Sequence, residues 1–186
     1  MRIISGFLKG KKIDFIRSTT TRPLRDFVKE NIFNIIKHTN LIRINLENSD
    51  VLDLYSGVGS FGLECISRGV RKSTFVENDN RAIITLKKNL NILEVEKQSE
   101  VFNEKTTSFL NRQNNKNKFE VIFFDPPFAE NLFIEELKKI KNSLIYKKKH
   151  LVIIHRDRKS KDILDNILNI LLIKSYGRSK IIFGTF

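Results

Sequence analysis

The stretch from Phe119 to Phe128 reads Phe-Glu-Val-Ile-Phe-Phe-Asp-Pro-Pro-Phe. Its apolar residues 121–124 are rich in β-formers and predict a strand that is buried on both faces of a parallel sheet. Pro126 and Pro127 end this strand, because proline has no N–H for the ladder and a fixed φ. The chain therefore leaves the sheet at the carboxyl end of the strand, which is the edge where open α/β sheets bind ligands.

The Asp-Pro-Pro-Phe arm carries groups that suit a reaction on an amine. The exocyclic amino group of a nucleobase is a weak nucleophile, because its lone pair is delocalised into the ring. Two acceptors on its N–H bonds, the Asp125 carboxylate and the Pro126 carbonyl, would hold the nitrogen toward tetrahedral geometry and free the lone pair. Phe128 would stack on the base. The alternative is purely structural: the prolines only end the strand and Phe128 lies in the core.

A second apolar stretch, 51–54, is followed by a turn rich in glycine. The turn matches the pattern G-x-G-x-x-G through Gly57, Gly59 and Gly62, and a helix over 60–68 is predicted after it. A strand, a glycine-rich turn and a helix in this order form the nucleotide-binding turn of α/β proteins. The pattern alone is weak evidence, but its place between these elements makes a nucleotide site the favoured interpretation.

An acidic residue downstream supports this interpretation. A strand over 73–76 leads to Glu77, which stands 20 residues after Gly57, the spacing at which a carboxylate hydrogen-bonds a ribose diol. Asp53, in the strand 51–54, would repel a pyrophosphate but suits the ammonium group of S-adenosylmethionine, contacted through water. Together with the Asp125 arm, this favours S-adenosylmethionine over a dinucleotide and methyl transfer as the reaction.

Strand and helix patterns alternate along the chain, which predicts an α/β fold. We expect a Rossmann-like, mostly parallel sheet with helices on both faces and a closing antiparallel strand pair. His155 follows a predicted strand and is expected in an exposed loop. The further helices are predicted over 24–37, 79–90, 106–112 and 132–144, the further strands over 100–103 and 151–154, and the closing pair over 169–176 and 180–185.

The first 23 residues are predicted to form a small appendage. Two short β-like pieces, around Ile3-Ile4 and 12–15, are punctuated by glycine and predict a hairpin. A polar and basic loop is predicted over 17–23. The expected boundaries are therefore 1–23 for the basic hairpin and loop, and 24–186 for the α/β domain.

The chain of 186 residues carries a net charge of +13. Such an excess suggests a polyanionic partner, with nucleic acid as the default. A compositional bias toward lysine is the competing explanation. The candidate RNA-binding residues, whose alternative role is a solvated surface, are Lys9, Lys11, Lys12, Arg17 and Arg22, with Lys29 in the following helix.

The sequence does not predict a disulfide, a metal site, a signal peptide or a membrane segment. Cys65 is the one cysteine, which excludes a disulfide within the chain, and it is expected in the core. His38, His150 and His155 are too scattered for metal-ligand spacing, so no metal is predicted. The N-terminus lacks the long apolar region of a signal peptide, and no run of about 18 apolar residues is present. We expect a cytoplasmic protein without a membrane segment.

The motifs together resemble a known enzyme class. The segments 53–64, Val76-Glu77 and Asp125-Pro126-Pro127-Phe128 are similar to the class I S-adenosylmethionine-dependent methyltransferases that methylate amino groups. The N-terminal pieces that narrow the resemblance are Arg2-Ile3-Ile4-Ser5-Gly6, Gly10-Lys11-Lys12, Thr21-Arg22-Pro23 and Glu30-Asn31-Ile32-Phe33-Asn34. With them the chain resembles the RsmD family, which methylates guanine N2 in bacterial 16S ribosomal RNA.

The resemblance implies a seven-stranded type of sheet and S-adenosylmethionine as the cofactor. It also implies that the protein is a monomer and that its partner is 16S ribosomal RNA in small-subunit particles. The catalytic residues that it implies are Asp125, Pro126 and Phe128. The cofactor-binding residues that it implies are Asp53, Tyr55, Gly57, Gly59, Glu77 and Asn78.

Three other functions remain open from the sequence. DNA adenine-N6 methyltransferases share the Pro-Pro arm, but they usually carry a target-recognition domain for which this chain leaves little room. An NAD-binding oxidoreductase would use the glycine-rich turn alone. A non-catalytic RNA-binding protein with a relic pocket would not be expected to keep both Glu77 and Asp125.

Overall fold

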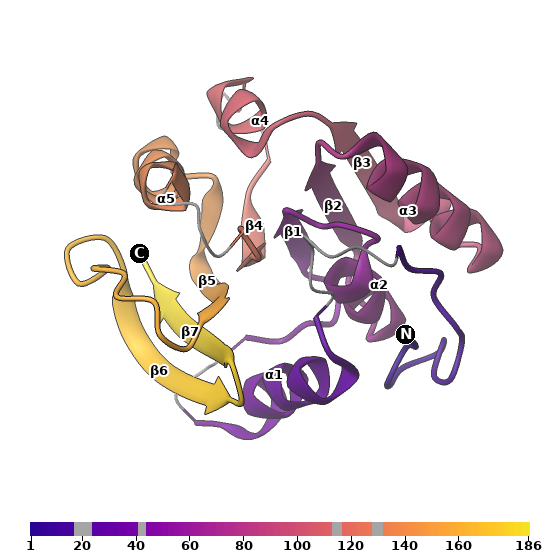
Figure 1. The fold of residues 1–186 in the computed structure, drawn as a ribbon, viewed down its shortest axis with the longest axis horizontal. Helices are drawn as coiled ribbons and strands as arrows, with labels where there is room; N and C mark the ends of the chain where they lie inside the picture. The colour runs from indigo at the N-terminus through magenta and orange to yellow at the C-terminus, as the bar shows by residue number, and fades with distance from the viewer. Residues whose placement is uncertain (17–23, 41–43, 113–116, 128–131) are drawn as a thin grey trace.

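The computed structural model describes residues 1–16, 24–40, 44–112, 117–127 and 132–186. Across these residues the chain forms one seven-stranded sheet in the order β3-β2-β1-β4-β5-β7-β6 (Figure 1). β1 to β5 are parallel, whereas β7 runs antiparallel between β5 and β6. The strands are β1 (Asp50–Leu54), β2 (Lys72–Glu77), β3 (Ser99–Asn103), β4 (Phe119–Phe124), β5 (Tyr146–Asp157), β6 (Asn169–Tyr176) and β7 (Ser179–Thr185).

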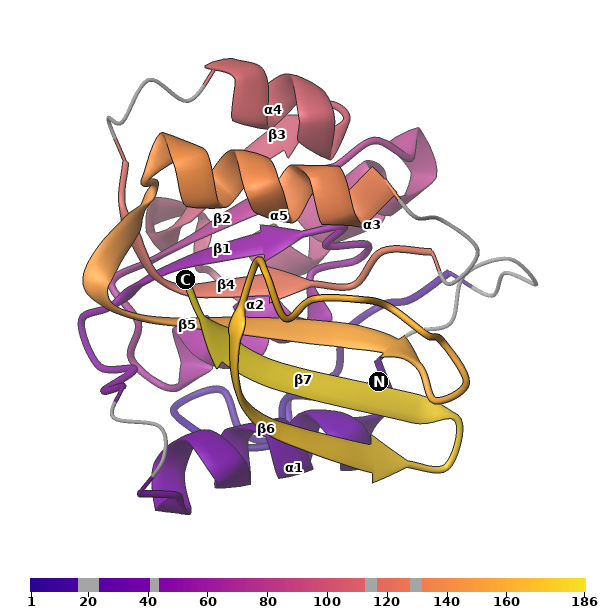
Figure 2. The same ribbon diagram turned by 90° about the vertical axis from the view of Figure 1, so that its left-hand side faces the viewer.

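Helices cover both faces of the sheet. α1, α2 and α3 pack on one face, and α4 and α5 pack on the other (Figures 1 and 2). The helices are α1 (Asp26–His38), α2 (Ser60–Ser67), α3 (Asn80–Ile92), the 3-10 turn η1 (Glu96–Gln98), α4 (Thr106–Arg112) and α5 (Leu132–Ser143). The predicted α/β fold, with its mostly parallel sheet and closing antiparallel pair, is confirmed. Of the described helices, none combines the length and the apolar composition needed to cross a bilayer.

Alternate residues of the central strands face two hydrophobic cores. In β1, Val51 packs in the core under α1, α2 and α3, whereas Leu52 and Leu54 pack in the core under α4 and α5. Phe123 and Phe124 of β4 divide between the two cores in the same way. Both faces of these strands are therefore buried, as the continuous apolar runs in the sequence predict.

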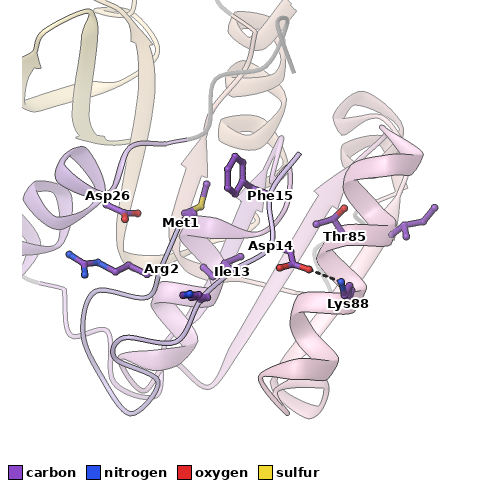
Figure 3. A pocket seen from close by; sticks show the side chains of 10 residues that line it. Met1, Arg2, Ile13, Asp14, Phe15, Asp26, Thr85 and Lys88 are labelled. Carbon is purple, nitrogen blue, oxygen red and sulfur yellow. Dashed lines mark ion pairs between the residues drawn. The ribbon is translucent and has the colours of Figure 1, made fainter. Parts of the chain in front are cut away.

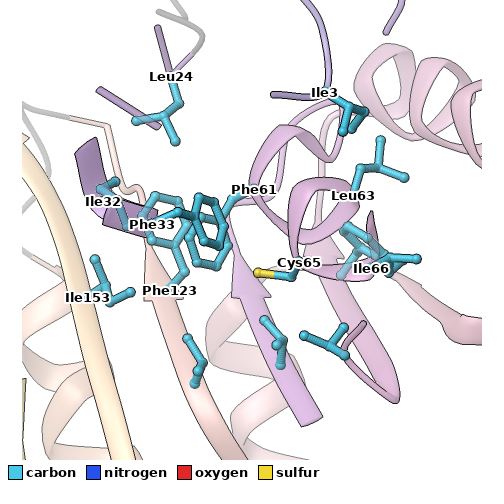
Figure 4. Packing of buried hydrophobic residues seen from close by; sticks show 14 of the residues in the cluster. Ile3, Leu24, Ile32, Phe33, Phe61, Leu63, Cys65, Ile66, Phe123 and Ile153 are labelled. Carbon is cyan, nitrogen blue, oxygen red and sulfur yellow. The ribbon is translucent and has the colours of Figure 1, made fainter. Parts of the chain in front are cut away.

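Three stacked rings join α1 and α2 to the sheet. The ring of Phe61 in α2 lies 5.3 Å from that of Phe33 in α1 and 4.0 Å from that of Phe123 in β4, centroid to centroid (Figure 4). Each such pair adds roughly 0.5–1.5 kcal/mol beyond the burial of the rings. Cys65 is fully buried in the same core, as predicted, and burial raises the pKa of its thiol well above the usual value.

The N-terminal hairpin packs against α2. Within residues 1–16 it has one antiparallel bridge, which places Arg2 opposite Lys12. The backbone N–H groups of Ile4 and Ser5 donate to the Glu64 carboxylate at 2.7 and 3.0 Å. Glu64 is fully buried, so this carboxylate anchors the hairpin to the helix that follows the glycine-rich turn.

Lys29 belongs to the core and not to a basic surface, which corrects the prediction. Its side chain is fully buried, and its ammonium group donates to the Arg2 carbonyl at 2.8 Å and to Ser60 Oγ at 3.2 Å. The Lys29 Nζ also lies 3.6 Å from Glu64 Oε2. Burial lowers the pKa of Lys29, and the nearby carboxylates of Glu64 and Asp26 partly offset this effect. Lys29 is therefore not exposed to an RNA partner.

β5 is longer than the sequence predicts. The apolar run predicted a strand over 151–154, but the strand extends from Tyr146 to Asp157. The residues near the start of the strand are charged, so the apolar pattern of the sequence does not include them. One of them is Lys147, whose Nζ lies 2.6 Å from Glu120 Oε1 of β4. His155 consequently lies inside a strand with only 4% of its surface exposed, and the prediction that it lies in an exposed loop is wrong.

Candidate active site

The glycine-rich turn connects the carboxyl end of β1 to the first residue of α2. Gly57 adopts a φ of +55°, and nothing lies within 4 Å of the position where a Cβ would stand, so its backbone faces open space. Gly59 adopts a φ of +86°, and a Cβ there would lie 2.4 Å from Leu86 Cδ1 of α3. Gly57 therefore permits a ligand to approach the backbone, whereas Gly59 permits the turn to pack against α3.

Glu77 ties this turn to the end of β2. Its Oε2 accepts a hydrogen bond from Gly57 N–H at 2.8 Å. Its Oε1 accepts from the N–H groups of Asn78 and Asp79, both at 2.8 Å. Hydrogen bonds to an ionised acceptor are stronger than those between neutral groups. The Glu77 carboxylate is therefore held rigidly at the carboxyl edge of the sheet, beside the open side of Gly57.

Two buried polar atoms below the turn lack partners among the described residues. Asp53 Oδ2 accepts from Gly62 N–H at 2.9 Å, but Asp53 Oδ1 and Ser56 Oγ are buried without a hydrogen bond. Burial raises the pKa of the Asp53 carboxyl well above its usual range; the Gly62 N–H offsets part of this effect, and the nearby Asp125 and Glu77 reinforce it. A cationic group bound above the turn would reverse this penalty, which fits a cofactor with an ammonium group.

Tyr55 and Asn78 are the other predicted cofactor-binding residues near the turn. Tyr55 adopts a φ of +59°, and its hydroxyl donates to Glu136 Oε2 of α5 at 2.7 Å. This contact directs the hydroxyl to α5, and the side chain also packs against the core under α4 and α5. Asn78 is exposed immediately after Glu77. Near it, Asn103 Nδ2 at the end of β3 donates to Asn80 Oδ1 at 3.0 Å, which places amide groups along the predicted adenine side.

The Asp-Pro-Pro arm leaves β4 at the same edge of the sheet, beside β1. The Asp125 N–H donates to the Leu54 carbonyl at 3.4 Å. One carboxylate oxygen of Asp125, Oδ1, lies 2.8 Å from His155 Nδ1. His155 Nε2 in turn lies 2.8 Å from the Ser179 hydroxyl. The candidate amine-binding carboxylate is therefore part of a hydrogen-bonded series that continues through β5 to β7.

Arg156 holds the same arm from the other face of β5. Its Nη1 donates to the Pro127 carbonyl at 3.1 Å. Its guanidinium group forms two 3.2 Å hydrogen bonds with the carboxylate of Asp162, and its Cζ lies 4.3 Å from the centroid of the Phe133 ring. The side chain is 1% exposed. A buried, bidentate and stacked guanidinium is well ordered, so Arg156 fixes the direction in which the arm leaves the sheet.

Comparison with known proteins gives the family. A protein-family profile described as "Conserved hypothetical protein 95" matches residues 1–185. Ribosomal RNA small subunit methyltransferase D of Haemophilus influenzae is 39% identical over 133 residues, which are 71% of this chain and 66% of that protein. The protein of the same name from Buchnera aphidicola (subsp. Acyrthosiphon pisum) is 32% identical over 84% of this chain and 78% of its own length. The chain belongs to the RsmD family of methyltransferases.

A solved structure supports the same conclusion for the fold. An Escherichia coli protein described as a "Putative methyltransferase" superposes with a TM-score of 0.81 and 25% identity, over 99% of this chain and 96% of that one. The predicted RsmD resemblance is thus confirmed. The predicted cofactor, S-adenosylmethionine, is confirmed with it, since it is the methyl donor of methyltransferases with this fold.

The remaining predicted site residues of this RsmD-family chain divide into two groups. Phe128, Arg17 and Arg22 lie outside the described residues. Lys9, Lys11 and Lys12 are exposed on the N-terminal hairpin, as a nucleic-acid surface requires. Sequence reasoning missed the contacts that His155 and Arg156 make to the arm. The signal that would have found them is their position directly after the apolar run 151–154, where the next strand of a parallel sheet reaches the same edge.

A cavity of about 580 Å³ opens between the N-terminal hairpin and α3 (Figure 3). Its lining includes the cationic side chains of Arg2, Lys12 and Lys88, and Lys88 pairs with Asp14 at 2.7 Å. The ring of Phe15, also in the lining, is 45% exposed. Cationic groups beside an exposed aromatic ring are the combination with which proteins bind unpaired nucleotides.

Proposed function

We propose that this protein transfers a methyl group from S-adenosylmethionine to the exocyclic N2 amine of a guanine in 16S ribosomal RNA of the small subunit. The observation that carries the proposal is the Asp125-Pro126-Pro127 arm, which leaves β4 at the same sheet edge as the Gly57 turn and Glu77. The names of the relatives support a ribosomal RNA substrate.

The described residues offer contacts for several parts of the cofactor. A carboxylate has about four lone-pair sites, so beyond its three backbone donors Glu77 keeps one acceptor site, on Oε2, for a ribose hydroxyl. Gly57 permits close approach of the backbone, and Asn78 would contact the adenine. Asp53 Oδ1, buried without a partner among the described residues, suits the cofactor ammonium group through a bridging water.

The arm supplies the acceptors that the amine requires. S-adenosylmethionine, when bound, supplies an electrophilic methyl group on a sulfonium. Asp125 Oδ2 and the Pro126 carbonyl accept hydrogen bonds from the two N–H groups of the amine. These two hydrogen bonds turn the nitrogen lone pair toward that methyl group. Positioning of this kind supplies most of the acceleration. The amine loses a proton after methylation, and Asp125 accepts it or passes it to water. The guanine must be unstacked to reach the arm, so an RNA loop or a flipped base is the expected target.

The direct test is methylation of small-subunit particles that lack the modification. Purified protein with S-adenosylmethionine is expected to produce N2-methylguanosine in 16S RNA, identified by mass spectrometry after nuclease digestion. Free 16S RNA, assembled particles and duplex DNA are compared in parallel. Methyladenine in DNA would establish the adenine-N6 alternative. A protein that binds RNA but transfers no methyl group to any of these substrates would be a non-catalytic binding protein.

Glu77→Ala is expected to weaken S-adenosylmethionine binding by roughly 1–3 kcal/mol, because charge-assisted hydrogen bonds to the ribose are lost and the Gly57 N–H loses its partner. Isothermal titration calorimetry measures the change. The control is Glu96→Ala in η1, an exposed carboxylate that accepts from Asn91 Nδ2 at 2.9 Å and precedes β3, away from the carboxyl ends of the strands. Equal affinities of wild type and Glu77→Ala would remove Glu77 from the cofactor site.

The exposed lysines of the hairpin are expected to contact RNA phosphates. Replacement of Lys9, Lys11 and Lys12 by Gln should flatten the slope of log K against log salt by roughly 2–3 units, at about 0.9 per phosphate contact for a duplex and somewhat less for single strands. Affinity for S-adenosylhomocysteine should not change. The measurement is a salt titration of RNA binding by fluorescence anisotropy.

A matched triple variant controls for the loss of net charge. The control residues, Lys138, Lys139 and Lys141, lie on α5. α5 covers one face of the sheet, whereas the hairpin packs against α2 on the other face. Replacing them by Gln removes the same charge and should leave the salt slope close to that of the wild type. Equal salt slopes of RNA binding in the two triple variants would show that the hairpin lysines contribute to RNA binding only through the net charge of the protein.

A further inference from the structure

We propose that His155 is a positioning residue for methyl transfer: it holds the Asp125 carboxylate as an acceptor for the target amine, and Ser179 fixes its tautomer. The inference rests on the proposed function, since it assigns a role within the same site. Three consecutive elements of the sheet, the end of β4, β5 and the start of β7, supply the three side chains.

The sheet register brings Asp125 and His155 together. Phe123 pairs with Ile153 and Phe124 with Ile154 across β4 and β5, so Asp125 and His155 are the next residues in register. Phe123 and Ile153 face the core under α1 and α2. Because side chains alternate along a strand, Asp125 and His155 lie on that same face. The backbone pairing of β4 with β5 therefore brings the two side chains together, and His155 Nδ1 lies 2.8 Å from Asp125 Oδ1.

The chemistry of the three groups selects one tautomer. An ionised carboxylate only accepts hydrogen bonds, so His155 Nδ1 carries the hydrogen in its contact with Asp125. In the neutral ring Nε2 is then an acceptor, and the Ser179 hydroxyl, at 2.8 Å, donates to it. The side chain of His155 is 5% exposed, and that of Asp125 is 21% exposed. The ring is thus buried, whereas the carboxylate that it holds still reaches solvent.

The result is an arm with its acceptors already in place. His155 engages Asp125 Oδ1, and Arg156 engages the Pro127 carbonyl from the opposite face of β5. Among the described residues, Asp125 Oδ2 and the Pro126 carbonyl receive no donor, and these are the two acceptors that the amine needs. Two neighbouring residues of one strand thereby hold the arm from both sides. Preorganisation of this kind lowers the barrier without adding contacts to the substrate.

His150 provides an internal comparison on the same strand. It is also buried, and its Nδ1 lies 2.9 Å from the Lys147 carbonyl while its Nε2 accepts from the Phe186 N–H at 2.9 Å. Both of its partners are backbone groups, of Lys147 near the start of β5 and of Phe186 directly after β7, and neither belongs to the arm. His150 therefore has the burial and hydrogen bonding of His155 without the link to the carboxylate, which makes His150→Asn the matched control.

The decisive pair of variants is His155→Leu and His155→Asn. The Asn Nδ2–H stands as many bonds from Cα as His Nδ1–H, so Asn keeps a donor toward Asp125, whereas Leu fills the space without one. His155→Leu is expected to lower kcat about 10–100-fold, the usual effect of a residue that orients a reacting group, with KM for RNA and Kd for S-adenosylhomocysteine within about twofold of wild type. His155→Asn is expected to recover most of kcat. His150→Asn should leave kcat unchanged.

Two further measurements keep the proposal falsifiable. Ser179→Ala removes the partner of Nε2 alone and is expected to lower kcat severalfold. Nitrogen chemical shifts of the His155 ring should show a protonated Nδ1 and an unprotonated Nε2, whether or not the protein is active. Wild-type kcat in His155→Leu, or an Nε2-protonated tautomer, would overturn the positioning role. Absence of methyl transfer in the wild type would instead contradict the proposed function, and the ring shifts would still decide the tautomer.

Discussion

Asp125→Ala is expected to reduce methyl transfer by roughly 10²–10⁴-fold, the usual contribution of a positioned proton acceptor. The Asp125 carboxylate touches the amine in the proposed mechanism, and the cofactor is held by other residues, in particular Glu77 and the Gly57 turn. Affinity for S-adenosylmethionine should therefore stay within about twofold of the wild-type value. Single-turnover kinetics on small-subunit particles measure the chemical step without interference from product release.

Two companion variants sharpen this test. Asp125→Asn keeps one oxygen acceptor but loses the charge, so we expect a rate between those of wild type and Asp125→Ala. Asp165→Ala removes an exposed carboxylate between β5 and β6 and should not change the rate. Wild-type turnover in Asp125→Ala would contradict the role of the arm. A parallel loss of cofactor binding would move Asp125 from the amine to the cofactor.

Glu64→Ala is expected to destabilise the protein by about 3–5 kcal/mol, the cost of breaking a buried ion pair from one side. The Glu64 carboxylate is fully buried and accepts from Ile4 N–H, Ser5 N–H and Arg68 Nε at 2.7, 3.0 and 2.8 Å. Its removal leaves these three donors without their acceptor and takes the nearer of two carboxylates from the buried Lys29 ammonium group. Urea denaturation followed by circular dichroism gives the change in the free energy of unfolding.

The buried pair also permits a rescue experiment. Replacing both charges, in a Glu64→Gln and Lys29→Met double variant, should recover much of the stability, because neither buried charge remains unpaired. Glu96→Ala serves as the exposed control, with an expected change within about 0.5 kcal/mol. A loss below about 1 kcal/mol in Glu64→Ala would mean that water or other groups replace the carboxylate.

The parts of the site that were predictable from the sequence are those fixed by local chemistry. Glycines between a strand and a helix, and an Asp followed by two prolines after an apolar run, specify turns within a few residues. Glu77 was found because its distance from the turn is set by one strand–helix–strand unit. These features need no knowledge of which distant strands are neighbours, and they place the cofactor turn and the arm at one edge of the sheet.

The parts that were not predictable depend on long-range packing. The role of His155 follows from the register of β5 against β4, and the polar residues 155–157 gave no sign that the strand continued past Ile154. Lys29 was assigned to a surface because of its charge. Its spacing to Ile32, Phe33 and Ile36 places it on the buried stripe of α1, and that periodicity was the available signal.

The strand order has a consequence for how the site forms during synthesis. β1 lies between β2 and β4 in the sheet, and β4 pairs with it from about 70 residues further along the chain. β1, β2 and β3 associate through short crossovers, so the glycine turn and Glu77 belong to a half of the sheet that is synthesised first. The Asp125 arm arrives only when β4 closes the long loop. A nascent chain therefore possesses the proposed cofactor-binding edge before it possesses the proposed amine-binding arm.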